Sequence, residues 1–157
     1  MSSHSLEPIY NFVPITEHLA TAGQPTEAQF AEIKAAGYQV VINLALPNST
    51  NAIAHEQAIV ESAGLEYVHI PVIWENPTLE DLDRFFQTLK ENTERKVFVH
   101  CAMNMRVSAF TYLYRVTQQQ VDAIAAKAEM DKIWTPNETW QKFIDQAMQH
   151  YLPSGQG

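Results

Sequence analysis

Short apolar runs alternate along the chain with longer stretches in which apolar residues recur every three or four positions. Most of the short runs combine β-branched and aromatic residues and end at turn-forming residues, which is typical of buried strands. They predict strands at Tyr10 to Val13, Leu19 to Ala22, Val40 to Leu44, Tyr67 to Ile70 and Lys96 to His100.

The longer stretches carry the start and stop signals of helices. Thr26 is followed three residues later by Gln29, which is a capping-box arrangement, and Gly37 closes that segment. Thr78 begins a stretch whose apolar residues are spaced for one helical face, with Asp81 as its capping partner. Further helices are predicted at Asn51 to Ala63, from just after Asn104 through Tyr114, at Gln119 to Met130 and at Asn137 to Tyr151.

The alternation of strand and helix predicts an α/β fold with three layers, in which helices flank a mostly parallel central sheet. We expect the 157 residues to form a single domain, with residues 153–157 as a flexible tail. Right-handed crossovers place the carboxyl ends of parallel strands on one edge of the sheet, where ligands bind in such folds. The residues just after Val99 are therefore the first place to look for a site.

The charge balance narrows the range of partners. The chain has 10 Lys and Arg against 18 Asp and Glu, which gives a net charge of −8 at pH 7. A chain this acidic is a poor general binder of nucleic acid or of an anionic membrane. An anionic ligand has to be attracted by local groups against the field of the whole protein.

A single cysteine excludes an internal disulfide and a cysteine-rich metal cage, and it fits a reducing compartment. The opening residues, MSSHSLEPIY, lack the cationic and apolar regions of a secretory signal. The longest apolar run, near Val40 to Leu46, is too short to span a bilayer. We therefore expect a cytoplasmic protein that does not enter the membrane.

The run VFVHCAMNMRVSAF combines several features of a catalytic loop. A buried strand ends at His100, a six-residue loop follows, and an amphipathic helix departs. This arrangement directs backbone N–H groups and the positive end of a helix dipole at one point, where an anion binds readily. Cys101 at that point is favoured as a thiolate, and Arg106 can give a bidentate contact to an oxyanion. These are the parts of a nucleophilic cysteine enzyme.

A buried cysteine after a strand is also a common small core residue. Here the preceding His100, the arginine five positions after Cys101 and the strand-to-helix position all favour the functional interpretation. His100 itself is expected to fix the loop by hydrogen bonds rather than to act as a base.

The run HCAMNMR resembles the active-site loop of the protein tyrosine and dual-specificity phosphatases, whose pattern is HC-x5-R followed by Ser or Thr. Three further runs resemble a bacterial phosphatase-like family of about this length: ITEHLATAGQPTEAQF, VVINLA and HIPVIWENPTLEDLDRF. The resemblance covers Ile15 to Tyr114, which is most of the chain, and it implies a phosphotyrosine phosphatase-like fold.

The resemblance also implies roles for individual residues. Cys101 would attack phosphorus to form a phosphocysteine, Arg106 would hold the equatorial oxygens, and Ser108 would assist the departing thiolate in the second step. The implied substrate is a phosphorylated small molecule or protein. The phosphate-binding loop would comprise Ala102, Met103, Asn104, Met105 and Arg106.

The loop departs from the family pattern in its length, because Cys101 and Arg106 enclose four residues instead of five. Val107 stands where the pattern has its arginine, and Ser108 stands where it has its hydroxyl. The usual glycines are missing, so Asn104 is the only residue that readily adopts left-handed backbone angles. A loop of this size is similar to that of the rhodanese-type sulfurtransferases. Two alternatives therefore stay open: a sulfurtransferase that uses a Cys101 persulfide, and a catalytically weak phosphate-binding module.

Hydrolysis of a phosphate ester is assisted by an acid that protonates the leaving oxygen. Glu75 is the best-placed carboxylate, in the loop before Thr78, and Asp81 is the alternative, although capping already explains it. Trp74 is either a wall for an aromatic substrate or a core or rim residue. The segment Ala20 to Pro25 either approaches the site or is an ordinary strand-to-helix turn.

We predict neither a metal nor another cofactor, because the histidines lack ligand spacing and His100 beside Cys101 makes a poor zinc pair. The apolar residues of the C-terminal helices belong either to the core or to a dimer face, which leaves a homodimer open. The histidines considered are His4, His18, His55 and His69, and the apolar residues are Ile124, Ile133, Trp134, Trp140, Phe143 and Ile144.

Overall fold

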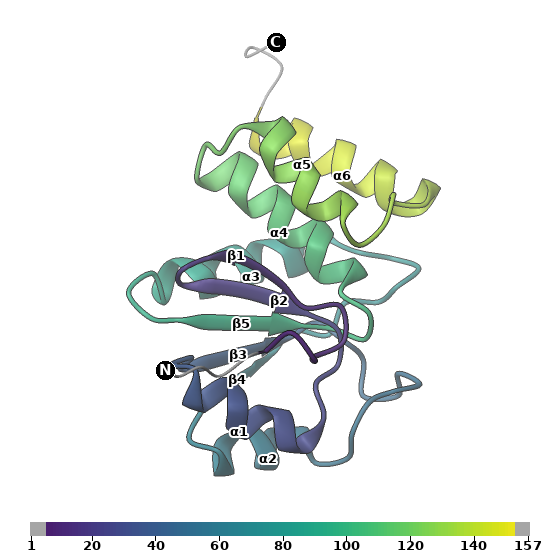
Figure 1. Ribbon diagram of the computed structural model, residues 1–157. Coiled ribbons are helices and arrows are strands. Elements are labelled where there is room, and N and C mark those ends of the chain that lie inside the picture. The colour runs from purple at the N-terminus through teal and green to yellow at the C-terminus, as the bar shows by residue number, and fades with distance from the viewer. Residues whose placement is uncertain (1–5, 153–157) are drawn as a thin grey trace.

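The computed structural model of the chain describes residues 6–152, and the flexible tail expected at residues 153–157 lies outside them. In the described part, five strands form one central sheet between two layers of helices (Figure 1). The predicted α/β fold with three layers and a mostly parallel sheet is confirmed.

The sheet has the strand order β1-β2-β5-β3-β4, and only β1 and β2 pair antiparallel. His100 at the end of β5 lies opposite Ala22 on β2 and Asn43 on β3. The carboxyl ends of three parallel strands therefore meet where β5 ends. The strands are β1 (Val13–Thr16), β2 (Leu19–Ala22), β3 (Val40–Asn43), β4 (Glu66–His69) and β5 (Val97–His100).

Helices α1 and α2 cover one face of the sheet, α3, α4 and α6 lie on the other, and α5 packs against α4 (Figure 1). Thr26 and Thr78 cap α1 and α3 as predicted: the hydroxyl of Thr26 accepts a hydrogen bond from Gln29 N, and that of Thr78 from Asp81 N. The helices are α1 (Glu27–Ala35), α2 (Glu56–Ser62), α3 (Leu79–Glu91), α4 (Met105–Gln118), α5 (Ala123–Asp131) and α6 (Glu138–Tyr151).

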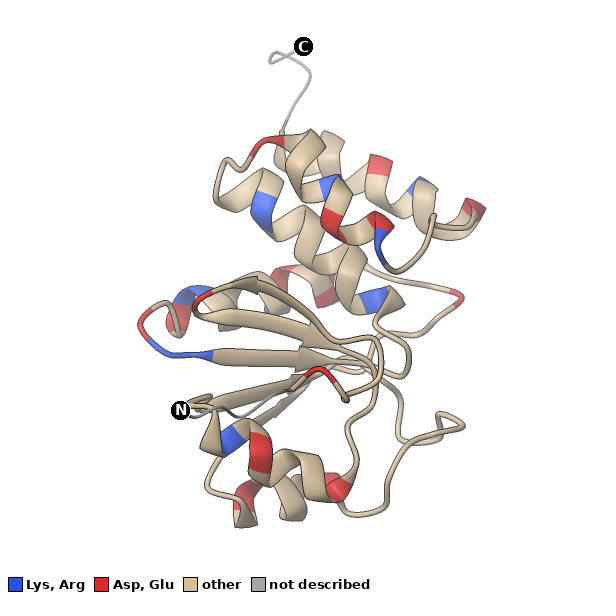
Figure 2. Ribbon diagram, in the orientation of Figure 1, with Lys and Arg blue, Asp and Glu red and all other residues tan. Residues whose placement is uncertain are grey.

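The central strands contribute to two cores by the period of two that a strand imposes. Val41 and Phe98 face the α1 and α2 layer, where they join Phe30. Ile42 and Val99 face the opposite layer and join the core of α3, α4 and α6. Strands β2, β3 and β5 carry no Lys, Arg, Asp or Glu (Figure 2), as expected of strands buried on both faces.

The first strand was predicted from Tyr10 and instead begins at Val13. A hydrogen bond of 3.1 Å from Phe12 N to Ile9 O closes a turn at this point. Asn11 within the turn has a φ of 52°, which a strand does not allow. This turn contacts the loop that follows β5, through Asn11.

Two predicted helices begin later than expected. Helix α2 starts at Glu56 and not at Asn51, because the preceding residues form turns and His55 has a φ of 61°. Helix α5 starts at Ala123 and not at Gln119, because Gln120 has a φ of 55° and ends the preceding helical path. The turns before α2 also contact the loop that follows β5, through Asn51.

We predict that Phe110→Ala lowers the free energy of unfolding by about 3–5 kcal/mol, since it leaves a cavity in the main core. The Phe110 ring is buried against Phe85, Trp140 and Phe143, at centroid distances of 5.6, 6.0 and 5.8 Å. Ile124→Ala is the control, because Ile124 is 81% exposed. Chemical denaturation measures both, and equal losses for the two variants would contradict this description of the core.

Candidate active site

Residues Cys101 to Asn104 connect the end of β5 to the first turn of α4, at the edge where the parallel strands end. Cys101 is 1% exposed, and its N–H donates to the carbonyl of Ala22 on β2 at 3.3 Å. Asn104 has a φ of 68° and ψ of 6°, so the loop turns into the helix through the left-handed angles expected of this residue.

The carbonyl groups of the loop are held outward by the surrounding framework. Each of three consecutive carbonyl oxygens accepts at least one hydrogen bond from a group outside the loop. These bonds are His100 Nδ1 to Cys101 O at 3.1 Å, Gln24 N and Asn51 Nδ2 to Ala102 O at 3.0 and 2.9 Å, and Asn11 Nδ2 to Met103 O at 3.0 Å. Asn11, Gln24 and Asn51 were not identified from the sequence.

The backbone N–H groups of the loop, unlike its carbonyl groups, are not used in hydrogen bonds to the described protein groups. Within residues 6–152, no backbone N–H from residue 102 to residue 106 donates a hydrogen bond to a protein acceptor. The side chain of Asn104 forms no cap on α4, so the first N–H groups of that helix are also available. Free amides around a helix N-terminus form an anion-binding nest, and this nest lies beside the cysteine.

The segment Ala20 to Pro25 does approach the loop, which settles a question that the sequence left open. A Cβ on Gly23 would lie 2.8 Å from the carbonyl oxygen of Ala102 and 2.7 Å from Cδ2 of Tyr10. Only glycine allows this close approach of two backbone segments. The turn after β2 therefore supports the loop directly.

Asn104 is fixed by its side chain as well as by its backbone. It is fully buried, and its Nδ2 donates to the carbonyl of Asn11 at 2.9 Å and to the hydroxyl of Thr21 at 3.0 Å. The turn at Asn11 thus holds the loop through two contacts, one to Asn104 and one to Met103.

Cys101 and Arg106 lie together in one pocket, of about 480 Å³ including the solvent at its mouth. Arg106 is 7% exposed and donates from Nη1 to the carbonyl of Val72 at 2.9 Å. Its Cζ lies 5.9 Å from the centre of the Trp74 ring. The pocket is lined by Trp74, Cys101, Ala102, Met103, Met105 and Arg106.

Trp74 forms one wall of this pocket and is itself held by two other tryptophans. Its ring lies 5.4 Å from Trp134 and 5.7 Å from Trp140, and Trp140 Nε1 donates to its carbonyl at 2.9 Å. The wall that Arg106 packs against is therefore anchored to α6.

His100 is fully buried behind the loop, and its ring contacts the Glu56 carboxylate. Its Nε2 lies 2.5 Å from Glu56 Oε2, while Gln24 Nε2 donates to Glu56 Oε1 at 2.9 Å. Burial alone would raise the pKa of Glu56, but the hydrogen bonds from His100 and Gln24 and the charge of His100 outweigh it, so the pKa is lowered. Nothing in the sequence around Glu56 signalled this role.

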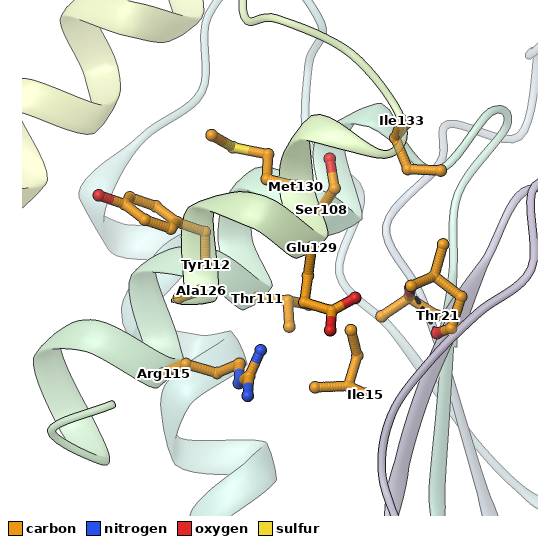
Figure 3. A pocket seen from close by; sticks show the side chains of 11 residues that line it. Ile15, Thr21, Ser108, Thr111, Tyr112, Arg115, Ala126, Glu129, Met130 and Ile133 are labelled. Carbon is orange, nitrogen blue, oxygen red and sulfur yellow. Dashed lines mark hydrogen bonds between the residues drawn. The ribbon is translucent and has the colours of Figure 1, made fainter. Parts of the chain in front are cut away.

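Ser108 does not join Cys101 in the pocket. Its hydroxyl donates to the carbonyl of Met105 at 2.8 Å and accepts from Trp134 Nε1 at 3.0 Å. It lines a different pocket, of about 260 Å³ including the solvent at its mouth, between α4, α5 and the first two strands (Figure 3). The hydroxyl is thus engaged within α4 and by the segment after α5.

Neither predicted acid reaches the pocket. Glu75 is exposed in the turn after Trp74 and makes no hydrogen bond or ion pair with any described residue. Asp81 lies in the first turn of α3, where its N–H donates to the hydroxyl of Thr78 at 3.1 Å. Among residues 6–152, no Asp or Glu side chain lines the pocket that holds Cys101.

The described residues contain no group of three or more His, Cys, Asp and Glu side chains placed to hold a metal ion. None of the helices in residues 6–152 combines the length and the apolar character needed to cross a bilayer.

A family profile described as "DSP-PTPase phosphatase fused to NAD+ Kinase" matches residues 14–149. The chain belongs to this family. The match includes the whole loop from Cys101 to Arg106 and most of the helices that support it. The protein is therefore a member of the cysteine-based, phosphatase-like proteins, as the resemblance of HCAMNMR indicated.

Solved structures of other proteins share the fold of this DSP-PTPase family member. A DUF442 protein from Shewanella putrefaciens CN-32 is 35% identical, with a TM-score of 0.84 over 93% of this chain and 96% of its own. TpbA from P. aeruginosa superposes with a TM-score of 0.72 over 90% of this chain and 88% of its own. At 18% identity, TpbA supports the fold alone.

The curated relatives of this DSP-PTPase family member are longer proteins. A beta-lactamase hydrolase-like protein from Xylella fastidiosa is 38% identical over 98 residues, which cover 60% of this chain and 22% of the relative. The protein of that name from Agrobacterium fabrum is 36% identical over 94 residues, covering 57% and 21%. The matched region therefore spans about a fifth of these relatives.

We predict that Asn104→Ala destabilises this DSP-PTPase domain by about 1 kcal/mol more than Asn104→Gly, because only alanine adds the cost of left-handed backbone angles. Both variants lose the side-chain bonds to Asn11 and Thr21, so the comparison isolates the backbone. Denaturant unfolding measures the difference. A glycine variant no more stable than the alanine variant would contradict the assigned strain.

A second prediction concerns acid stability. Because the folded protein lowers the pKa of Glu56, this carboxylate stabilises the fold above its ordinary value of 4.5. That contribution is lost as the pH falls below 4.5 through the lowered pKa. As the pH is lowered below 4.5, the free energy of unfolding should therefore fall less steeply in Glu56→Gln than in Glu61→Gln. Glu61 is the control because it is an exposed residue on the same helix. Parallel curves for the two variants would refute the assignment.

Proposed function

We propose that this protein hydrolyses phosphate monoesters through a covalent phosphocysteine on Cys101. The observation that carries the proposal is the shared pocket of Cys101 and Arg106, beside the free backbone amides of residues 102–106. A phosphoryl group in this position is held by oriented N–H donors while the sulfur attacks it. Membership of a phosphatase-like family supports the same reaction.

The reaction has two steps. The Cys101 thiolate attacks phosphorus, so that the S–P bond forms, the ester P–O bond breaks and the leaving oxygen departs with the electron pair. Water then attacks phosphorus, the S–P bond breaks, and inorganic phosphate and the thiolate are released. One N–H of Arg106 is used by Val72 O, and the guanidinium retains donors for the equatorial oxygens.

The lining of the pocket favours a substrate with an apolar leaving group. Its other walls are Trp74, Met103 and Met105, and Arg106 is the one cation among its described lining residues. With a net charge of −8 on the chain, a polyanionic substrate gains little beyond the single phosphoryl contact. Because no described carboxylate lines the pocket, a leaving group that departs without protonation, such as a phenolate, fits best.

Hydrolysis of p-nitrophenyl phosphate tests this function. We expect turnover in the parent protein, none in Cys101→Ser, and a loss of about 10²–10³-fold in kcat/KM for Arg106→Lys, which removes the planar donor array. Arg84→Lys, at an exposed position of α3, is the matched control and should keep its activity. Glu75→Gln should also keep its activity on this ester, because the carboxylate lies outside the pocket and the leaving group needs no acid.

A second candidate is sulfur transfer, which three observations favour. The loop has four residues between Cys101 and Arg106, no described carboxylate lines the pocket, and the hydroxyl of Ser108 is engaged elsewhere. In this reaction the thiolate attacks the outer sulfur of thiosulfate, forming Cys101–S–S⁻, and sulfite departs with the electrons of the broken S–S bond. Cyanide then takes the outer sulfur as thiocyanate. Neither step needs an acid or a serine.

The two reactions are separated by the adduct on Cys101. Phosphate transfer leaves a phosphocysteine that rapid acid quenching and mass spectrometry detect, whereas thiosulfate leaves a mass gain of one sulfur atom. Phosphorylated enzyme with p-nitrophenol release establishes the first function, and a persulfide with thiocyanate formation establishes the second. A rise in Tm caused by phosphate, without either adduct, would show that the protein binds phosphate but catalyses neither reaction.

A further inference from the structure

The pocket between α4 and α5 combines apolar walls with two buried polar groups (Figure 3). Val13, Ile15 and Met130 contribute apolar walls. Thr111 is 3% exposed, and the Nε and Nη1 atoms of Arg115 are buried as well. Neither the Thr111 hydroxyl nor these two guanidinium nitrogens form a hydrogen bond with any group in residues 6–152. Since buried polar groups in folded proteins are almost always paired, these atoms indicate a partner inside the pocket.

Thr111 differs in this respect from two other threonines inside helices. On α4 itself, the hydroxyl of Thr117 donates to the carbonyl of Leu113 at 2.6 Å. On α3, the hydroxyl of Thr88 donates to the carbonyl of Arg84 at 2.8 Å. A threonine within a helix can satisfy its hydroxyl in this way, through the carbonyl four residues earlier. Thr111 makes no such bond in the described part of the chain, so its hydroxyl is available to a group in the pocket.

A carboxylate faces these donors from α5. Figure 3 shows the side chains of Glu129 and Arg115 directed into the same space, with Thr111 beside them. Glu129 Oε1 lies 2.9 Å from Lys132 Nζ, and no ion pair among the described residues joins Glu129 to Arg115 directly. A molecule in the pocket therefore meets hydrogen-bond donors on α4 and an acceptor on α5.

Size and charge select the molecule that fits. The pocket measures about 260 Å³ including the solvent at its mouth, and its narrow interior has room for about one molecule of the size of water. A chloride ion would accept from Arg115 but would meet the Glu129 carboxylate, and an alkali cation would meet the guanidinium. Water is uncharged and both accepts and donates hydrogen bonds, so it fits the donors and the acceptor together.

We propose that this pocket is the binding site of one buried water molecule, which accepts a hydrogen bond from Arg115, donates one to Glu129 and has the Thr111 hydroxyl as its third partner. The water links α4 to α5 at a place where their side chains form no direct pair. The proposal is independent of the proposed function, because the described residues that line this pocket and those that line the Cys101 pocket are different.

The water site adjoins the residues that support the wall of the Cys101 pocket. The chain continues from α5 to Trp134, whose Nε1 donates at 3.0 Å to Ser108, which lines the water site. The Trp134 ring in turn lies 5.4 Å from the Trp74 ring. A water that fixes α5 against α4 therefore also supports the placement of Trp74.

A crystal structure of the parent protein grown in sodium bromide tests the site directly, because bromide occupies halide sites and scatters anomalously. We expect density for a single water within hydrogen-bond distance of Arg115 and Glu129, and no anomalous peak in the pocket. An anomalous peak there would overturn the proposal in favour of an anion site. Density for a larger molecule, or a direct ion pair between Arg115 and Glu129 with nothing between them, would also overturn it.

Nuclear Overhauser effects between water and protein protons measure the same site in solution, because a buried water stays near its neighbours far longer than surface water does. We expect these signals at the protons around Thr111, and their loss in Thr111→Val, which keeps a similar side-chain size and removes one partner of the water. Thr117→Val is the matched control and should keep them, since Thr117 is also buried on α4 but its hydroxyl bonds to Leu113.

A folded Thr111→Val protein with unchanged signals would contradict the proposal, as would a parent protein without them. Should Thr111→Val fail to fold, the crystal structure and the spectrum of the parent protein decide. Neither measurement uses a phosphate ester or thiosulfate, so a water site found in a protein that catalyses neither reaction would stand, and only the proposed function would be rejected.

Discussion

The outward anchoring of the carbonyl groups in the Cys101 loop is the constraint on which the rest of the site depends. A peptide unit whose carbonyl points away from the pocket presents its N–H toward it, because the two groups lie on opposite sides of a planar trans peptide. Donors from Asn11, Gln24, Asn51 and His100 hold three consecutive carbonyls in this way. The free amides are a consequence of the framework, and Arg106 adds charge to a nest that the backbone has already formed.

This framework is assembled by the sheet. Parallel pairing brings the ends of β2, β3 and β5 to one level, so the segments that follow β2 and β3 both reach the loop that follows β5. Gln24 comes from the first of these segments, and Asn51 and Glu56 come from the second. A local change in any of these connections therefore alters the anion-binding geometry without touching the cysteine.

The sequence predicted the features that are encoded locally. The strand before Cys101, the left-handed turn at Asn104 and the cap at Thr78 each follow from a few neighbouring residues, and the structure confirms these features. Contacts across more than thirty residues left no local signal, as with Glu56 and His100. The surroundings of Ser108 gave no local signal either, because its hydroxyl accepts a hydrogen bond from Trp134, which follows α5.

The most direct test of the account is an NMR titration of nitrogen-labelled protein with inorganic phosphate, following the backbone amides. The account predicts saturable shifts that are largest for the amides of residues 102–106, and the same pattern in Cys101→Ser, since the framework and not the thiol orients these groups. Shifts confined to exposed lysines, with the loop amides unchanged at saturating phosphate, would contradict it.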